Sequence, residues 1–250
     1  PRHGFSVRCL RDAEFIEVQG CTDPSYDEYD ASANTDDGSC TTLVGCSESD
    51  FVSMDGYDYD VVQVGDQCWF AENLRSTVYA DGTAIPEVTG NGAWTGLSSG
   101  ARCDYGNDAD NVDTYGRLYN WHAVDDARGL CPSGWHVPTD GEWTDLEGYI
   151  TSQGFAGTEG TALKSTSGWS SGNGTDDFGF SALPGGLRDY YNGSFNIAGG
   201  NGYWWSSSPD GANAWLRALR NSNSGVNRHN YNPRHGFSVR CLRDAEFIEV

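Results

Sequence analysis

The sequence predicts an α+β protein made of short, twisted β-sheets, one or two helices and long loops. Glycine accounts for 33 of the 250 residues, which favours many turns and short strands over long helices. The clearest helix signature lies at 139–153, whereas short runs rich in β-branched and aromatic residues recur along the chain. Nine Trp, thirteen Tyr and ten Phe supply apolar surface for a core.

The first predicted hairpin lies near the start of this β-rich region. The β-rich stretch that contains VVQV at 61–64 and CWF at 68–70 is broken by Gly65-Asp66, which is a hairpin signal. Gly56 marks an earlier turn. Glycine and proline then interrupt every run across 76–113, so we expect mainly loop there.

Two helices are expected in the middle of the chain. Residues 116–129 favour a short helix with its apolar side chains on one face. The helix at 139–153 has Thr139 as N-cap and Glu142 three residues later, which together form a capping box. Its apolar stripe comprises Trp143, Leu146 and Ile150, and Gly154 ends it.

The last predicted strand covers 235–242. Phe237, Val239 and Cys241 alternate with polar residues, a pattern typical of a strand with one buried face.

This strand belongs to a duplicated stretch. PRHGFSVRCLRDAEFIEV occurs at 1–18 and again at 233–250 without a single difference. The copies start 232 positions apart, so the sequence predicts a tandem repeat unit of 232 residues. We expect a window of an array: 1–18 is the terminal strand and tail of a preceding repeat, 19–45 an acidic connector, and 46–250 a domain with its own terminal strand and tail.

Eight cysteines indicate disulfides and an oxidising, extracellular compartment, either secreted or at the cell surface. The predicted pairs are Cys21–Cys40, which closes the connector, Cys46–Cys68 and Cys131–Cys241. This assignment leaves Cys103 over, and Cys103 is also an alternative to Cys131 as the partner of Cys241. The connector has almost no aliphatic residues and cannot bury a core, so its disulfide is expected to hold it together.

The formal net charge is −21, which disfavours nucleic acid and anionic membranes as partners. No apolar run is long enough for a membrane span. Hard cations prefer several oxygen ligands from one loop, so calcium is the predicted cofactor. The candidate ligands are Asp104, Asp108, Asp110 and Asp113; the alternative is a solvated acidic loop.

Six segments, in order, resemble the Fibrobacter succinogenes major paralogous domain: VVQVGDQCWFAENLR, TYGRLYNWHAV, CPSGWHVPTDGEWTDLE, GFSALPGG, GYWWSSS and GFSVRCLRD. The resemblance spans about 46–244. It implies a C-type-lectin-like fold, distantly similar to the sulfatase-modifying domain, on secreted and surface proteins of bacteria. The connector resembles a GCTDP…DDGSC module of bacterial surface proteins.

No enzyme activity is expected, because HExxH and GxxxxGK[ST] motifs are absent. The resemblance agrees, since sulfatase-modifying enzymes use two cysteines late in the chain, where this sequence has only Cys241. A glycan-binding surface module is the alternative function. Its candidate stacking platform is Tyr203, Trp204, Trp205 and Trp215; the opposing interpretation places the paired Trp in the core.

The sequence therefore predicts a structural repeat of an extracellular bacterial fibre or long adhesin stalk, whose partners are copies of itself. Phe5, Val7 and Cys9 repeat the pattern of the last strand, so we expect them to fill the equivalent slot of an adjacent copy. Cys9 would bond that copy's equivalent of Cys131. Either the array is one polypeptide or separate subunits donate the strand; the first is favoured because 12–18 runs directly into the connector.

Overall fold

The computed structural model describes residues 17–22, 30–39, 46 and 51–244. They belong to two compact units, one in residues 1–45 together with 246–250 and one in residues 46–245. In the small unit, β1 (Gln19–Gly20) pairs in parallel with β2 (Thr35–Asp36). Aspartate side chains close its turns: Asp30 accepts hydrogen bonds from the backbone and hydroxyl of Ser32. Local polar contacts therefore shape this unit.

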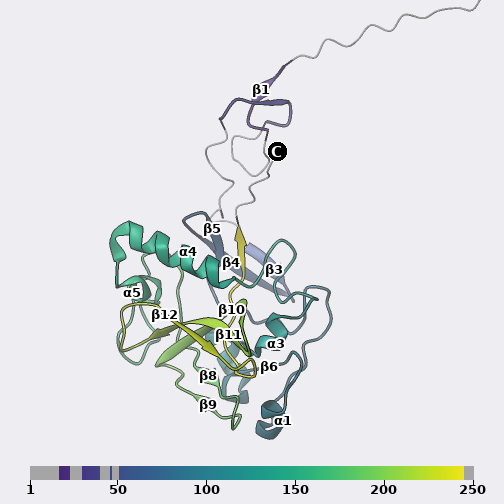
Figure 1. The fold of residues 1–250 in the computed structure, drawn as a ribbon, viewed down its shortest axis with the longest axis vertical. Coiled ribbons are helices and arrows are strands. Elements are labelled where there is room, and N and C mark those ends of the chain that lie inside the picture. The colour runs from purple at the N-terminus through teal and green to yellow at the C-terminus, as the bar shows by residue number, and fades with distance from the viewer. Residues whose placement is uncertain (1–16, 23–29, 40–45, 47–50, 245–250) are drawn as a thin grey trace, which may run out of the picture. The chain divides into compact units, whose positions relative to one another are not determined.

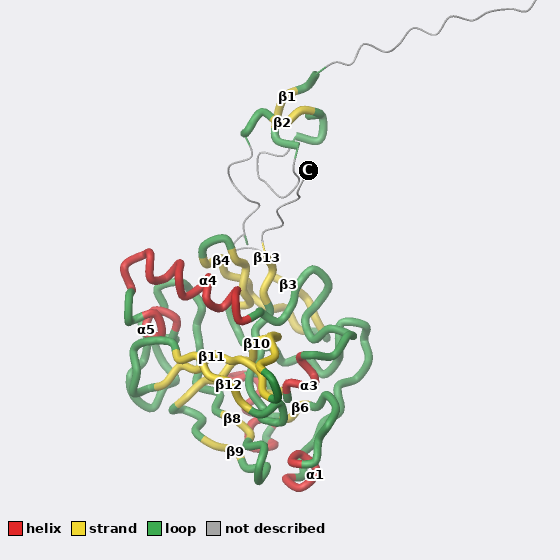
Figure 2. The backbone as a smooth tube through the Cα atoms, in the orientation of Figure 1, coloured by secondary structure: helices red, strands yellow, loops and turns green. Residues whose placement is uncertain are grey.

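The main unit contains two larger sheets, which Figures 1 and 2 show on either side of the longest helix. The four-stranded antiparallel sheet has the order β13-β5-β4-β3. Its strands are β3 (Phe51–Met54), β4 (Tyr57–Val64), β5 (Gln67–Phe70) and β13 (Leu242–Asp244). The three-stranded antiparallel sheet consists of β10 (Asn201–Asp210), β11 (Asn213–Arg220) and β12 (Asn227–Tyr231).

Two short strand pairs complete the β-structure of the described residues. They are β6 (Arg102–Cys103) with β7 (Leu118–Tyr119), and β8 (Leu187–Arg188) with β9 (Phe195–Asn196). The helices are α1 (Asn91–Thr95), α2 (Val112–Tyr115), α3 (Trp121–Val124), α4 (Asp140–Ile150) and α5 (Glu159–Leu163). The mixture of small sheets and short helices agrees with the predicted α+β class.

The structure contains the hairpin turn and the capping box that the sequence predicts. The hairpin between β4 and β5 turns at Gly65, whose positive φ of 65° favours glycine. In α4 the Thr139 hydroxyl accepts from the Glu142 backbone N–H, and the Glu142 carboxylate accepts from the Thr139 N–H. The helix continues into a π-helical turn at 151–155, where Gly154 has a φ of 99°.

The predicted short helix within 116–129 is confirmed only for Trp121–Val124. Leu118 and Tyr119 form β7, which pairs with β6, and only the four residues of α3 are helical. The Asn120 side chain accepts a hydrogen bond from the Ala123 N–H and so starts a new helix after the strand. Tertiary strand pairing here overrides the apolar spacing.

The two largest of four apolar clusters form most of the core among the described residues of the main unit. One lies around Phe70, Tyr119, Trp205 and Phe237. The other packs the α4 stripe against the two larger sheets; its members include Trp143, Leu146 and Ile150 from α4, Trp69 from β5, Trp204 from β10 and Leu242 from β13. Residues 237–242, which lead into β13, contribute to both clusters, because Phe237 belongs to the first and Leu242 to the second.

Candidate functional site

The candidate site is the place where the second copy of the duplicated stretch enters the domain. We call residues 233–244 the terminal segment, and the backbone groups that hydrogen-bond it the slot. The segment begins at Trp121, whose N–H donates to the Pro233 carbonyl at 2.8 Å. It ends as β13, which pairs with β5 through Leu242 opposite Trp69.

Between these ends the terminal segment hydrogen-bonds to strands and loops from most of the domain. Phe237 exchanges both backbone hydrogen bonds with Tyr119 of β7, and Gly236 does so with Arg188 of β8. Ser238 lies between two residues of β10: its N–H donates to the Tyr203 carbonyl and its carbonyl accepts from the Trp205 N–H. Further bonds reach Leu74, Phe70 and His136. The slot is therefore assembled from parts of the chain that are distant in sequence.

The side chains of the segment are buried on both faces. Each of the six consecutive residues 237–242 is at most 1% exposed. Phe237, Val239 and Cys241 are buried as the sequence predicted, but Ser238 and Arg240 are buried as well, so the expected exposed face does not exist. The reason is that Arg240 and Ser238 find polar partners inside the protein.

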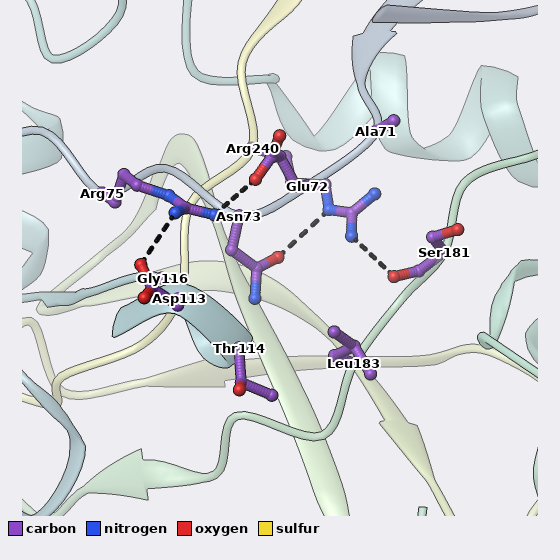
Figure 3. Close-up of a pocket in the computed structure, with 10 residues that line it drawn as sticks. All are labelled: Ala71, Glu72, Asn73, Arg75, Asp113, Thr114, Gly116, Ser181, Leu183 and Arg240. Carbon is purple, nitrogen blue, oxygen red and sulfur yellow. Dashed lines mark hydrogen bonds and ion pairs between the residues drawn. The ribbon is translucent and has the colours of Figure 1, made fainter. Parts of the chain in front are cut away.

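Arg240 joins three stretches of backbone (Figure 3). Its guanidinium donates to the Asn73 side-chain oxygen at 3.1 Å, to the carbonyls of Phe70 and Phe180, and to the Ser181 carbonyl at 3.1 Å. Burial lowers the pKa of Arg240 to about 9. These carbonyl and amide oxygens compensate for the lost hydration of a buried guanidinium.

Asn73 is the second polar residue of this joint. Its oxygen also accepts from Trp204 Nε1 at 2.8 Å, and its amide donates to the Tyr115 carbonyl at 2.9 Å. Asn73, Arg240 and Ser181 line a small cavity of about 150 Å³ (Figure 3). The outer wall carries Arg75, which pairs with Glu72 at 2.5 Å and with Asp113 at 3.3 Å. Arg75, Glu72 and Asp113 are already paired with one another. We therefore interpret this cavity as a gap in the packing beside the slot.

A disulfide fixes the terminal segment covalently. Cys241 is bonded to Cys131, and the two Cα atoms lie 5.8 Å apart. Cys46 and Cys68 form the second predicted bond. Cys103 is free and buried, and burial raises the pKa of its thiol to about 12, so the thiol stays protonated at neutral pH.

Several predicted residues fall beyond the described part of the chain. Phe5, Val7 and Cys9 lie outside the described residues, and so does Cys40. Cys21 is buried and disulfide-bonded. Its predicted pairing with Cys40 stays a prediction.

The four aspartates of the predicted calcium site have different surroundings. Asp104 is buried and forms an ion pair with Arg117. Asp108 accepts from the Asp110 N–H and so caps a short 3-10 turn, while Asp113 is 92% exposed in its side chain and pairs with Arg75. Within residues 51–244 and the other described positions, no group of three or more acidic, His or Cys side chains is arranged to hold a metal ion.

The predicted glycan platform is wrong. Trp204 and Trp205 are at most 1% exposed, and Tyr203 is 4% exposed, because β10 is covered on both faces by the two apolar clusters. Trp215 is half-buried beneath the Arg228 guanidinium, 3.4 Å from its ring centre. The four rings therefore offer no common exposed face for a sugar.

The sequence did not predict the polar residues of the site. Arg240 and Asn73 could not be recognised from their residue types, because a lone Arg in an alternating strand usually faces solvent. The exact duplication of the stretch was the available signal, since it preserves the polar residues along with the apolar ones.

The fold and the slot define a disulfide-clamped α+β domain that is closed by its own last strand. A family model, the Fibrobacter succinogenes major domain, matches residues 62–243, and the chain belongs to this family. The match ends within β13 and so includes most of the terminal segment. No curated protein and no solved structure matches the chain. No helix among the described residues is long and apolar enough to cross a membrane.

Proposed function

We propose that this chain is a structural repeat of an extracellular bacterial fibre or long surface stalk, with a C-type-lectin-like domain and no catalytic role. The observation that carries the proposal is the burial of the terminal segment, whose sequence is repeated without change at 1–12. A segment that completes one domain is an efficient device for connecting that domain to the next.

The slot accommodates one segment, and residues 233–244 occupy it. The copy at 1–12 carries the same apolar side chains and the same cysteine, so it matches the slot of another copy of the domain. Burial of each Phe, Val or Leu stabilises such a joint by roughly 1.5–3 kcal/mol. A disulfide adds typically 2–4 kcal/mol. An occupied joint is therefore expected to persist under mild denaturing conditions.

Two arrangements use this joint. In a continuous array, each domain is closed by its own terminal segment, and the chain passes directly into the next connector. In a strand-donation polymer, a separate subunit supplies the segment across the joint. We favour the continuous array, because residues 12–18 join the duplicated strand to the connector without an interruption in sequence.

The remaining features support an extracellular role. Disulfides persist in oxidising compartments, and Cys131–Cys241 and Cys46–Cys68 are both present. The net charge of −21 keeps closely spaced repeats soluble. The small unit, with its bonded Cys21, fits a compact spacer between domains.

Electron microscopy of the native protein tests this proposal. We expect long threads with one globular body per repeat. Electrophoresis then separates the two arrangements: a continuous array stays at very high mass after boiling with reductant, whereas donated strands dissociate to single repeats. Isolated globular particles of one repeat, with or without reductant, would contradict the proposal.

A further inference from the structure

A second concave site lies in the main unit, and the proposed fibre does not use it. It is a hollow of about 550 Å³ between the β8–β9 loop, the three-stranded sheet and the start of the terminal segment. Its lining residues are Leu187, Asp189, Tyr190, Ile197, Tyr203, Asn213, Asn230, Tyr231, Asn232 and His235. Its size is that of pockets which hold small organic ligands.

The wall of the hollow is a continuous aromatic cluster. The His235 ring lies between Tyr190 and Tyr231, with ring centres 4.7 Å and 5.3 Å away. Behind it, His235 stacks on Phe237 at 5.1 Å, and Phe237 stacks on Tyr203 at 5.1 Å. This packing fixes the orientation of the half-exposed tyrosines, so a flat ligand meets a rigid surface.

Polar groups at the edge of the hollow are free to bind a ligand. Among the described residues, no hydrogen bond is made by the hydroxyls of Tyr190 and Tyr231 or by the side-chain amide of Asn213. The Asn230 amide nitrogen already donates to Asp210, and the Asn232 side-chain oxygen already accepts from Arg234. The site therefore offers at least two hydroxyls and the Asn213 amide beside an aromatic surface.

The lining carries no positive charge. It includes no Lys or Arg, and burial lowers the pKa of His235 to about 4, so this imidazole is neutral at pH 7. Asp189 is the one acidic group in the lining, and the whole chain is strongly acidic. The Arg234 guanidinium lies 5.6 Å from the Tyr190 ring centre, but it already donates to Asn232 and to the Thr95 carbonyl. Because the lining itself has no cation, anionic ligands are disfavoured.

An apolar side chain is exposed at the rim. Ile197, which lines the hollow, is 48% exposed. It is one of the four large hydrophobic residues that are exposed in the described part of the chain. Exposed apolar groups beside a concave polar site are typical of binding surfaces.

We propose that this hollow binds a neutral saccharide of one or two rings. A sugar ring has C–H groups on its face, which pack on Tyr190 and Tyr231, and hydroxyls on its edge, which hydrogen-bond to Asn213 and the phenols. This site replaces the Trp platform that the sequence suggested. It requires only one folded domain and is independent of the fibre proposal.

Isothermal titration calorimetry of the 250-residue chain tests the proposal, with maltose, cellobiose, lactose and mannobiose as neutral probes and glucuronate as the anionic control. We expect saturable binding of at least one disaccharide and none of glucuronate. Tyr190→Ala and Tyr231→Ala should each weaken that binding at least about tenfold. Tyr191→Ala is the matched control, because this neighbouring tyrosine does not line the hollow, and it should change the affinity less than about twofold.

Asn213→Leu is a second test that does not depend on the folding of the tyrosine variants, since it removes only the free amide at the start of β11. It should weaken binding while the thermal unfolding midpoint stays close to that of the parent chain. Absence of binding by all four disaccharides would overturn the proposal. Equal losses in Tyr190→Ala and Tyr191→Ala, or binding of glucuronate as tight as that of the disaccharides, would overturn it too.

Discussion

The terminal segment and the small unit before position 46 are built in opposite ways. In the terminal segment, residues 237–242 are all buried and their backbone partners come from across the domain. In the small unit, Cys21 is the one buried residue among those described. Its hydrogen bonds stay within residues 17–39: Asp30 bonds Ser32, and Val18 bonds Asn34. The domain thus determines the structure of the segment, whereas local turns and a disulfide determine that of the small unit.

This difference indicates how a chain of such repeats would respond to damage. A change in the terminal segment disturbs both apolar clusters at once and should unfold a whole domain. A change in the small unit affects a few local contacts and should leave the domain intact. The following predictions test that contrast, beginning with the largest effect.

Val239→Asp should abolish folding of the main unit in chains that are too dilute to donate residues 1–18 to one another. Val239 is 0% exposed, and an unpaired buried carboxylate costs several kcal/mol, comparable to the roughly 5–15 kcal/mol stability of a whole domain. Circular dichroism and urea unfolding measure the effect. Val7→Asp is the control, because Val7 occupies the same place in the other copy of the stretch, and it should leave the midpoint of the 250-residue chain unchanged. Equal damage by both variants would contradict the contrast.

Cys131→Ser should destabilise the main unit by about 2–5 kcal/mol, because it removes the bond that holds the terminal segment. The matched variant Cys21→Ser removes the disulfide of the small unit and should not shift the unfolding midpoint of the main unit. Urea unfolding, followed by tryptophan fluorescence, distinguishes the two, since all nine Trp lie in residues 46–245. A similar shift from both variants would show that the units are energetically coupled.

Acid should weaken the attachment of α4 to the terminal segment. Burial alone raises the pKa of Glu142, but hydrogen bonds from His136 and the Thr139 N–H hold it at about 2. A lowered carboxyl pKa stabilises the folded state above the unfolded value near 4.5, and this contribution is lost as pH falls from there towards 2. Because His136 is 42% exposed in its side chain, we expect at most about 2 kcal/mol.

Glu142→Gln should remove most of this pH dependence between pH 5 and 2 in denaturant titrations. His136 also exchanges backbone hydrogen bonds with Leu242, so the same residue connects the capping box to β13. If the parent and Glu142→Gln lose stability in parallel as pH falls, the carboxylate does not have this role.

The smallest expected effect concerns calcium. Because Asp104 is paired with Arg117 and no metal-holding group forms among the described residues, added calcium or a chelator should shift the unfolding midpoint by less than about one degree. Asp104→Asn should still destabilise the domain, by about 1–3 kcal/mol, because it leaves a half-buried guanidinium without its partner. If calcium instead raises the unfolding midpoint, and Asp104→Asn abolishes that increase, calcium binds at the predicted site.

The sequence predicted those features that depend on neighbouring residues. The capping box of Thr139 and Glu142 and the turn at Gly65 are local, and both are present. Features decided by tertiary contacts were missed: Leu118 and Tyr119 became a strand because β6 and the terminal segment pair with them. Trp205 is buried because its indole donates to the Tyr119 carbonyl inside the core, which no spacing rule predicts.

The candidate site shows the same division. Its apolar residues and its disulfide were predicted from alternation and cysteine positions. Arg240 was not, because its partners at Phe70, Phe180 and Ser181 come together only in the folded domain. The hollow that we propose as a saccharide site was missed for the same reason, since Tyr190, Asn213 and His235 lie in three separate parts of the sequence.

The central claim is that residues 233–244 close their own domain and that the identical copy at 1–18 closes the domain of another copy. Two chains test it most directly: residues 1–232 and residues 19–250, which have identical composition because 1–18 and 233–250 are the same. The 19–250 chain keeps its own terminal segment, whereas the 1–232 chain has one empty slot and one free segment.

Size-exclusion chromatography with light scattering, followed by non-reducing peptide mapping, gives the readout after both chains are refolded under oxidising conditions. We predict a monomer for 19–250 and head-to-tail oligomers for 1–232, with Cys9 bonded to Cys131 of the next chain. Excess synthetic peptide of sequence 233–250 should convert these oligomers into capped single domains. A 1–232 chain that stays monomeric, either unfolded even with the peptide or with its own Cys9–Cys131 bond, would contradict the account.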